Sequence, residues 1–215
     1  MLTLYTYFRS SAAYRVRIAL HLKDLPYTSV PVHLLRGGGE QHAPAYAQLN
    51  PTELVPTLVE GDVALGQSLA IMEYLEERHP APALLPGDAA GRARVRALAQ
   101  SIACDIHPLN NLRVLQYLQH ELQLDEAAKR KWCQHWITLG LTALEAQLQH
   151  SASTGAFCHG DTPTLADCCL IPQVFSARRF ETPLDAFPNI RRIESACLAL
   201  DAFQRAAPQA QADAA

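Results

Sequence analysis

The stretch LTLYTYFRSSAAYRVRIALHL, residues 2–22, decides how the chain begins to fold. Its first part alternates aliphatic and aromatic residues with threonines, which is typical of a β-strand from Leu2 to Tyr7. Ser10 and Ser11 then offer hydroxyl groups that cap helices, and small or aliphatic residues recur at helical spacing up to about Leu22. We therefore expect a strand that is followed at once by a helix.

The residues after this helix alternate between strand and helix signals in the same way. They predict a strand at Tyr27–Val32, a flexible loop at Gly37–Gly39, a short helix from about Gln41 to Leu49, strands at Thr57–Val59 and Val63–Leu65, and a helix from Ser68 to Arg78. The order βαβ then αββα is that of a thioredoxin-like α/β fold. Because this half has no cysteine, it cannot exchange disulfides with its own side chains.

A proline-rich stretch, Pro80 to Gly87, separates this half from an all-helical one. We predict domains at residues 1–80 and 88–215, joined by a linker at 81–87. Helical spacing covers Ala89–Leu118 with a kink at Pro108, Asp125 to about His150, Thr164–Phe180 and Pro188–Phe203. Thr164 and Asp167 are spaced as a capping box, so Asp167 is expected to serve the fold, and the tail from Ala206 is expected to fray.

Composition excludes several classes of function. The chain has 215 residues, and 18 basic against 21 acidic side chains give a net charge of −3, so we expect no nucleic-acid partner. The sequence has no run of about 18 apolar residues and no secretory signal, so we expect no membrane partner and a cytoplasmic location. The six cysteines contain no C-x-x-C and are expected to be reduced and mostly buried. We expect no metal site.

Three stretches carry a resemblance to a known family. Residues 7–20, YFRSSAAYRVRIAL, closely resemble the S-S-C-x-x-R-V-R-I-A-L signature of zeta-class glutathione transferases, a class that includes maleylacetoacetate isomerase. Leu54-Val55-Pro56 and Gln67-Ser68 resemble the same family, and further matches continue in order along nearly the whole chain. The resemblance implies a thioredoxin-like domain followed by an all-α domain, a homodimer, and glutathione as the cofactor.

The resemblance also implies roles for individual residues. Ser10 would stabilise the thiolate of glutathione, the backbone beside a cis Val55-Pro56 bond would face its cysteinyl part, and Gln67-Ser68 would hold its γ-glutamyl carboxylate at a helix N-terminus. Other positions that match glutathione contacts of the family are Ser11, Gln41, His107 and Asn111. Arg9, Arg179 and Arg113 resemble arginines that bind substrate carboxylates, for which the planar guanidinium is suited.

Several of these residues keep a simpler explanation. Ser10 could only cap the helix, the three arginines could be ordinary surface residues, and His107 an ordinary helix histidine. Arg15 and Arg17 could touch glutathione, but their place in an apolar helix favours structural pairing. The chain also departs from the signature, because Ala12 stands where the family has cysteine; since related maleylpyruvate isomerases lack it too, Ser10 is the stronger candidate.

The implied chemistry is a rotation about a carbon–carbon double bond. A thiolate can add to the bond and depart again, which suits cis–trans isomerisation of a small dicarboxylate. The resemblance implies conversion of maleylacetoacetate to fumarylacetoacetate in tyrosine and phenylalanine breakdown. Maleylpyruvate isomerisation in gentisate degradation, conjugation or dehalogenation of small α-halo acids, and a non-catalytic binding role stay open.

Overall fold

The computed structural model describes residues 1–214. The chain forms two compact units, one made of Met1–Leu84 together with the segment from Leu198 onward, the other of Leu85–Cys197. The predicted linker at 81–87 lies where the first unit passes into the second, whereas the last part of the chain packs with the first unit. The division into domains at 1–80 and 88–215 stays a prediction.

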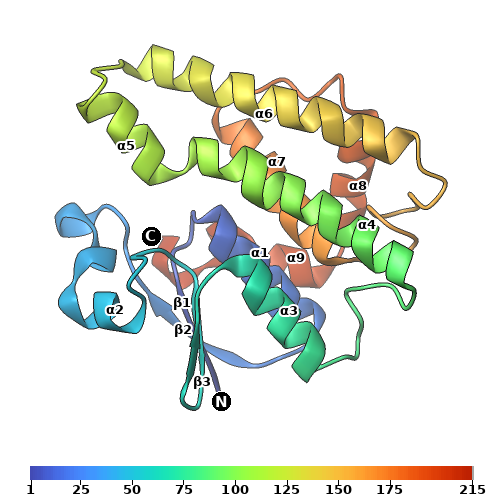
Figure 1. The fold of residues 1–215 in the computed structure, drawn as a ribbon, viewed down its shortest axis with the longest axis horizontal. Coiled ribbons are helices and arrows are strands. Elements are labelled where there is room, and N and C mark those ends of the chain that lie inside the picture. The colour runs from blue at the N-terminus through green and yellow to red at the C-terminus, as the bar shows by residue number, and fades with distance from the viewer. Residues whose placement is uncertain (215) are drawn as a thin grey trace. The chain divides into compact units, whose positions relative to one another are not determined.

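The first unit is built on a four-stranded mixed sheet. Its strands are β1 (Leu2–Thr6), β2 (Tyr27–Pro31), β3 (Thr57–Glu60) and β4 (Val63–Leu65), in the order β2-β1-β3-β4. β1 runs parallel to β2 and antiparallel to β3. The helices α1 (Ser11–Leu22) and α3 (Ser68–Arg78) pack together on one side of the strands, and α2 (Pro44–Leu49) lies on the other (Figure 1). This topology confirms the predicted thioredoxin-like domain.

The helix expected from Gln41 is shorter than predicted. Residues 40–42 form a single tight turn, and α2 begins only at Pro44. A proline disfavours helical backbone in the residue before it, and Ala43 is accordingly extended, with φ −62° and ψ 137°. Proline at the first position of a helix is favourable, because the N–H that it lacks would have no partner there. The loop before this turn has three glycines with positive φ, Gly37–Gly39.

The second unit is all-helical and confirms the predicted class. It consists of α4 (Ala89–Gln100), α5 (Leu112–His120), α6 (Glu126–Gln149), α7 (Leu165–Arg179) and α8 (Pro188–Leu198). Most residues of α7 are buried, and it packs against α4. The capping box predicted at its start is present: the carboxylate of Asp167 accepts from the backbone N–H and hydroxyl of Thr164, both at 2.8 Å.

The helix predicted at Ala89–Leu118 is broken rather than kinked. After α4 the backbone passes through a π-helical turn at Ser101–Ile106 and a 3₁₀ turn at His107–Asn110. Pro108 cannot donate a backbone hydrogen bond, and Asn111 leaves the helical region with ψ 149°. The Asn111 side chain then accepts from the N–H of Arg113 at 3.2 Å, so that it starts α5 as a new helix.

The expectations for the end of the chain are wrong in two respects. The helix predicted at Pro188–Phe203 is divided into α8 and a separate α9 (Asp201–Ala206), because Leu200 is extended. Residues 207–214 are also not frayed. α9 lies along α1, Ala206, Ala207 and Pro208 are buried, and the backbone N–H of Phe8 donates to Asp213 at 2.9 Å. Long-range contacts of this kind leave no local signal in an Ala- and Gln-rich tail.

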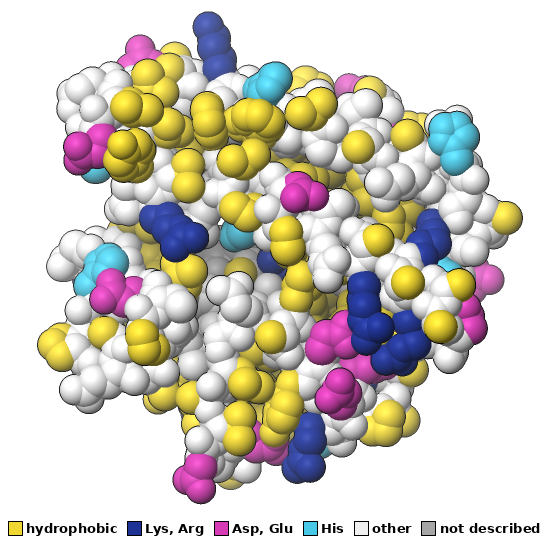
Figure 2. Space-filling model, in the orientation of Figure 1, with side chains coloured by type: hydrophobic (Ala, Val, Ile, Leu, Met, Phe, Trp, Pro, Cys, Tyr) yellow, Lys and Arg dark blue, Asp and Glu magenta, His cyan; other side chains and the backbone are white. Residues whose placement is uncertain are grey.

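Side-chain burial agrees with a globular chain. Five of the six cysteines are buried, as expected, and Cys104 is exposed. In the face drawn in Figure 2, hydrophobic side chains gather over the helical unit, and the exposed Tyr117, Leu122 and Leu139 belong to that unit. Among residues 1–214 no helix is long and apolar enough to cross a membrane.

We predict that Asp167→Ala lowers the free energy of unfolding by about 3 kcal/mol or more, because the N–H groups of Cys158 and Thr164 lose their acceptor in a buried site. Asp125→Ala is the matched control, since Asp125 caps the exposed start of α6 and its loss should cost only about 1 kcal/mol. Urea unfolding measures both. Equal losses would show that burial adds nothing to the Asp167 cap.

Candidate active site

Ser10 lies at the turn between β1 and α1. Its backbone is extended, with φ −68° and ψ 116°, and its Oγ accepts from the N–H of Ala13 at 3.2 Å. Ser10 is therefore the N-cap of α1, as the sequence predicts. A hydroxyl group has one proton to donate besides its acceptor positions, and this bond uses only the oxygen. The side chain is partly exposed, and Ser11 is the first residue of the helix.

Arg9 presents an exposed guanidinium next to Ser10. Its Nη2 donates to the hydroxyl of Tyr7 at 3.3 Å, and the guanidinium carbon lies 5.3 Å from the centre of the Phe8 ring. A cation above an aromatic face is attracted by the negative charge of the ring. These contacts hold the positive charge of Arg9 close to the N-terminus of α1.

Val55 is brought beside this turn by an apolar cluster. Val55 and Tyr7 are buried in one cluster, and Phe8 packs against it. The peptide bond between Val55 and Pro56 is cis, as the resemblance implies. The first unit therefore brings the residues before Ser10 and the residue before Pro56 into one apolar cluster, although they are more than forty positions apart in sequence.

Gln67 and Ser68 begin α3. Gln67 is exposed and has a positive φ of 65°, a conformation that is uncommon outside glycine, while Ser68 is buried. The Ser68 hydroxyl accepts from Nη1 of the buried Arg15 at 3.1 Å. Arg15 thus joins α1 to the start of α3, in line with the structural pairing expected of it.

Gln41 lies in the tight turn before α2. Its Nε2 is 3.0 Å from Nε2 of His42, and its Oε1 is buried without a hydrogen-bond partner among the described residues. An amide oxygen of this kind is suited to accept from a ligand N–H.

The second unit holds the other predicted site residues in two neighbouring segments. His107, Asn111 and Arg113 share the break between α4 and α5, where the His107 Nε2 lies 3.4 Å from the Asn111 Nδ2. Arg113 is exposed. Arg179 is exposed at the end of α7, with its guanidinium carbon 4.5 Å from the centre of the Phe180 ring.

One turn of α6 holds both of these segments. Trp132 donates from Nε1 to the carbonyl of Leu109 at 2.7 Å, and Gln134 donates from Nε2 to the carbonyl of Phe180 at 2.9 Å. The positive charge of Arg179 also acts on Cys133, whose pKa is raised to about 11 mainly by burial. α6 therefore fixes the backbone beside Arg179 and the backbone before Arg113.

Arg17 is a further important residue whose partners sequence reasoning missed. It is fully buried, and its guanidinium donates to Thr6 Oγ1 and to the carbonyls of Phe8 and Ala206, each at 3.0 Å. Burial lowers its pKa to about 10, because a guanidinium deprived of water is less stable in its charged form. A basic residue in an apolar helix indicated pairing, but no local pattern pointed to these partners.

Comparisons with known proteins agree over the whole chain. Residues 4–83 match the family "Glutathione S-transferase, N-terminal domain" and residues 139–193 match "Glutathione S-transferase, C-terminal domain". The chain is 54% identical over 213 residues to a maleylpyruvate isomerase of Ralstonia sp, covering 99% of both chains. It is 51% identical to a probable maleylacetoacetate isomerase of Vibrio cholerae serotype O1, covering 99% of this chain and 98% of the relative.

Solved structures give the same result. A holo structure of a maleylpyruvate isomerase, described as a bacterial glutathione transferase of the zeta class, superposes with a TM-score of 0.96 at 53% identity, covering 99% of this chain and 100% of the other. The chain belongs to the zeta-class glutathione transferases. A maleylacetoacetate isomerase from Methylobacterium extorquens AM1 with bound malonate and glutathione has a TM-score of 0.95 at 42% identity, covering 99% of both.

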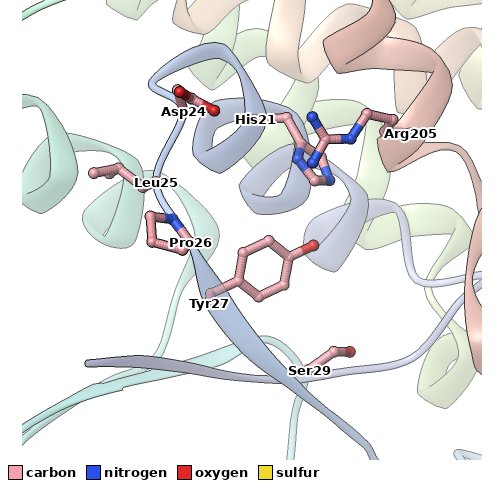
Figure 3. A pocket seen from close by; sticks show the side chains of 7 residues that line it. All are labelled: His21, Asp24, Leu25, Pro26, Tyr27, Ser29 and Arg205. Atoms are coloured by element: carbon pink, nitrogen blue, oxygen red, sulfur yellow. The ribbon is translucent and has the colours of Figure 1, made fainter.

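This zeta-class transferase also has a cavity away from the candidate site. The cavity measures about 590 Å³ and is lined by His21, Asp24, Leu25, Pro26, Tyr27, Ser29 and Arg205. Figure 3 shows the His21 ring beside the Arg205 guanidinium. His21 stands near the C-terminal end of α1, and a helix of 12 residues is about 18 Å long, so this cavity is well separated from Ser10. No predicted site residue lines it.

We predict that Ser10→Ala lowers the free energy of unfolding by about 1 kcal/mol, because the N–H of Ala13 loses its acceptor. Ser10→Asp keeps a capping oxygen and should stay close to the original protein. Ser11→Ala, which removes a hydroxyl inside the first turn, is the control and should change stability by about 0.5 kcal/mol or less. Thermal and urea unfolding measure these differences; an unchanged Ser10→Ala would contradict the capping role.

Proposed function

We propose that this zeta-class transferase is a glutathione-dependent cis–trans isomerase that converts maleylacetoacetate to fumarylacetoacetate. The observation that carries the proposal is Ser10 at the N-terminus of α1. Its oxygen caps the helix, while its hydroxyl proton is left to donate to a sulfur. Capping and thiolate stabilisation are therefore compatible roles for one side chain.

Three features of the first unit fit glutathione. The starts of α1 and α3 both offer backbone N–H groups and the positive end of a helix dipole, which favour a thiolate and a carboxylate. We assign the γ-glutamyl carboxylate to Gln67 and Ser68, and the cysteinyl backbone to Val55 beside Pro56. The buried Oε1 of Gln41 accepts a hydrogen bond from an N–H group of glutathione. Ser11, His107 and Asn111 are further proposed contacts.

Bound glutathione supplies a thiol that adds to the double bond and leaves after rotation. The task of the protein is to keep this thiol ionised. A thiol titrates near pH 8.5, so only a few per cent is ionised at neutral pH without help. Ser10 donates a hydrogen bond to the sulfur, and α1 contributes its dipole. A pKa lowered by about two units, equivalent to about 2.7 kcal/mol, makes the thiolate the main form.

The substrate is a dianion, and we propose exposed arginines as its partners. Arg9 and Arg179 each bind one carboxylate through the planar fork of the guanidinium, and Arg113 contributes further positive charge. Arg9 is held by the Tyr7 hydroxyl and the Phe8 ring, and Arg179 by the Phe180 ring, so both are partly ordered before a ligand binds. Partial order reduces the entropy that binding costs.

A second substrate has a specific argument in its favour. The Ralstonia relative named for maleylpyruvate is 54% identical to this chain, slightly more than the Vibrio relative at 51%. Maleylpyruvate is likewise a cis dicarboxylate, so the same groups could act on it. Conjugation or dehalogenation of small α-halo acids by the same thiolate is a third possibility. A homodimer and a cytoplasmic location also stay proposals.

We predict that both isomerisations need glutathione in catalytic rather than stoichiometric amount, because each turnover returns the thiol. Parallel assays of maleylacetoacetate and maleylpyruvate, with glutathione far below the substrate concentration, measure this, and the higher kcat/KM identifies the preferred substrate. Ser10→Ala and Ser10→Asp should lose about ten- to a hundred-fold in turnover, whereas Ser10→Thr keeps the hydroxyl and much of the activity.

Ala12→Cys is the control for this series and should leave turnover close to the original value. Permanent loss of one glutathione per substrate molecule would instead identify a conjugating enzyme. A fully active Ser10→Ala would move the stabilisation of the thiolate to another group.

We predict that Arg179→Ala raises KM for the dicarboxylate about ten- to a hundred-fold, because a charged hydrogen-bond partner is lost, and leaves the affinity for glutathione unchanged. Arg179→Lys should recover only part of the loss, since an ammonium keeps the charge without the fork. Arg178→Ala is the neighbouring control, because Arg178 is engaged by Glu194 at 2.6 Å. Weakened glutathione binding with an unchanged substrate KM would contradict this assignment.

A further inference from the structure

Phe8 lies in the turn between β1 and Ser10, and distant parts of the chain bind both of its backbone polar groups. Its N–H donates to Oδ2 of Asp213 at 2.9 Å, and its carbonyl accepts from Nη2 of Arg17 at 3.0 Å. The two contacts come from residues of opposite charge. Charge-assisted hydrogen bonds are stronger than neutral ones, so this peptide is held more firmly than an ordinary surface turn.

The neighbouring peptides of the turn are fixed as well. The carbonyl of Tyr7 accepts from the N–H of Ser10 at 3.0 Å and from Nη1 of Arg17 at 3.3 Å. Arg17 Nη1 also donates to Oγ1 of Thr6, which is the last residue of β1. Hydrogen bonds therefore fix consecutive residues between β1 and the N-cap of α1. Arg9 and Ser10 belong to this fixed turn.

Asp213 reaches this turn because the segment after α9 is held on the first unit. Gln211 donates from Nε2 to the carbonyls of Arg205 and Ala207, at 2.8 and 3.0 Å. Ala207 and Pro208 are buried. Asp213 itself is partly buried, and its negative charge partly offsets the cost of burying the charge of Arg17.

We propose that Asp213 and Arg17 are positioning residues, which hold the Tyr7–Ser10 turn so that the Ser10 hydroxyl points its proton at the thiol of glutathione. Neither residue touches the reacting atoms; both act through the backbone of Phe8. Water could satisfy the Phe8 N–H of an exposed turn, whereas a carboxylate from a segment about two hundred residues away fixes its direction. The inference rests on the function proposed above for Ser10.

The test begins with three single variants. Asp213→Ala removes the acceptor, Asp213→Asn keeps an amide oxygen that can accept from the Phe8 N–H, and Asp201→Asn is the control. Asp201 is an exposed acid of α9 whose Oδ2 lies 3.4 Å from Arg205. The readouts are the pKa of enzyme-bound glutathione from thiolate absorbance, kcat and KM for both substrates, and the thermal midpoint.

We expect Asp213→Ala to raise the pKa of the bound thiol and to reduce turnover at neutral pH by about three- to tenfold, with little change in KM for the dicarboxylate. Asp213→Asn should recover most of the loss, and Asp201→Asn should stay within about twofold of the original protein. Gln211→Ala, which loosens the segment without touching Phe8, should give a smaller effect in the same direction.

Unchanged thiol pKa and turnover in Asp213→Ala, with only a lower thermal midpoint, would overturn the inference, because the contact would then be merely structural. The double variant Ser10→Ala/Asp213→Ala adds a second check: it should be no slower than Ser10→Ala alone, and a further full loss would mean that Asp213 acts elsewhere. A fully active Ser10→Ala would overturn the proposed function, and this inference with it. A sensitive Ser10→Ala with an insensitive Asp213→Ala would overturn the inference alone.

Discussion

The buried guanidinium of Arg17 is the interaction on which the first unit depends. A charged group without water is stable only if its donors are satisfied, and Arg17 uses its donors on β1, on the turn before α1 and on the end of α9. β1 and the turn follow one another at the start of the chain, whereas the end of α9 lies about two hundred residues later in the sequence. Burial lowers the pKa of Arg17 to about 10, because the charged guanidinium is less stable without water. The hydrogen bonds that it donates in this buried position fix the turn before α1.

Local chemistry accounts for most of the fold that the sequence predicts. Ser10 as a cap, Thr164 and Asp167 as a capping box, and Gly61-Asp62 as the turn between β3 and β4 all use atoms within a few residues of one another. The features that the sequence did not predict depend on contacts between residues far apart in the chain. Trp132 of α6 donates to the carbonyl of Leu109 beside the break at Asn111, and the packing of the last described residues depends on Arg17 and Asp213. Such contacts join residues that no window of sequence contains.

Local sequence signals likewise account for only part of the candidate site. Residue type identified Ser10 as a helix cap, because a helix N-terminus constrains the residue there whatever the tertiary fold, whereas the resemblance supplied the site roles of Ser10, Gln67 and Ser68. The arginines were identified by resemblance alone, since an exposed Arg9 and an exposed surface arginine look the same in a sequence. In the structure, the guanidinium groups of Arg9 and Arg179 lie against the rings of Phe8 and Phe180, which are their neighbours along the chain. The sequence did not predict a cation–π contact for either pair.

Ala12, which stands where the family signature has cysteine, is compatible with the two roles of Ser10, helix capping and the proposed stabilisation of a thiolate. In the proposed function, the helix dipole of α1 and the Ser10 proton stabilise the thiolate of glutathione, and neither comes from the side chain at position 12. The orientation of the Ser10 hydroxyl then becomes the quantity that matters, and it is set by the backbone that Arg17 and Asp213 hold.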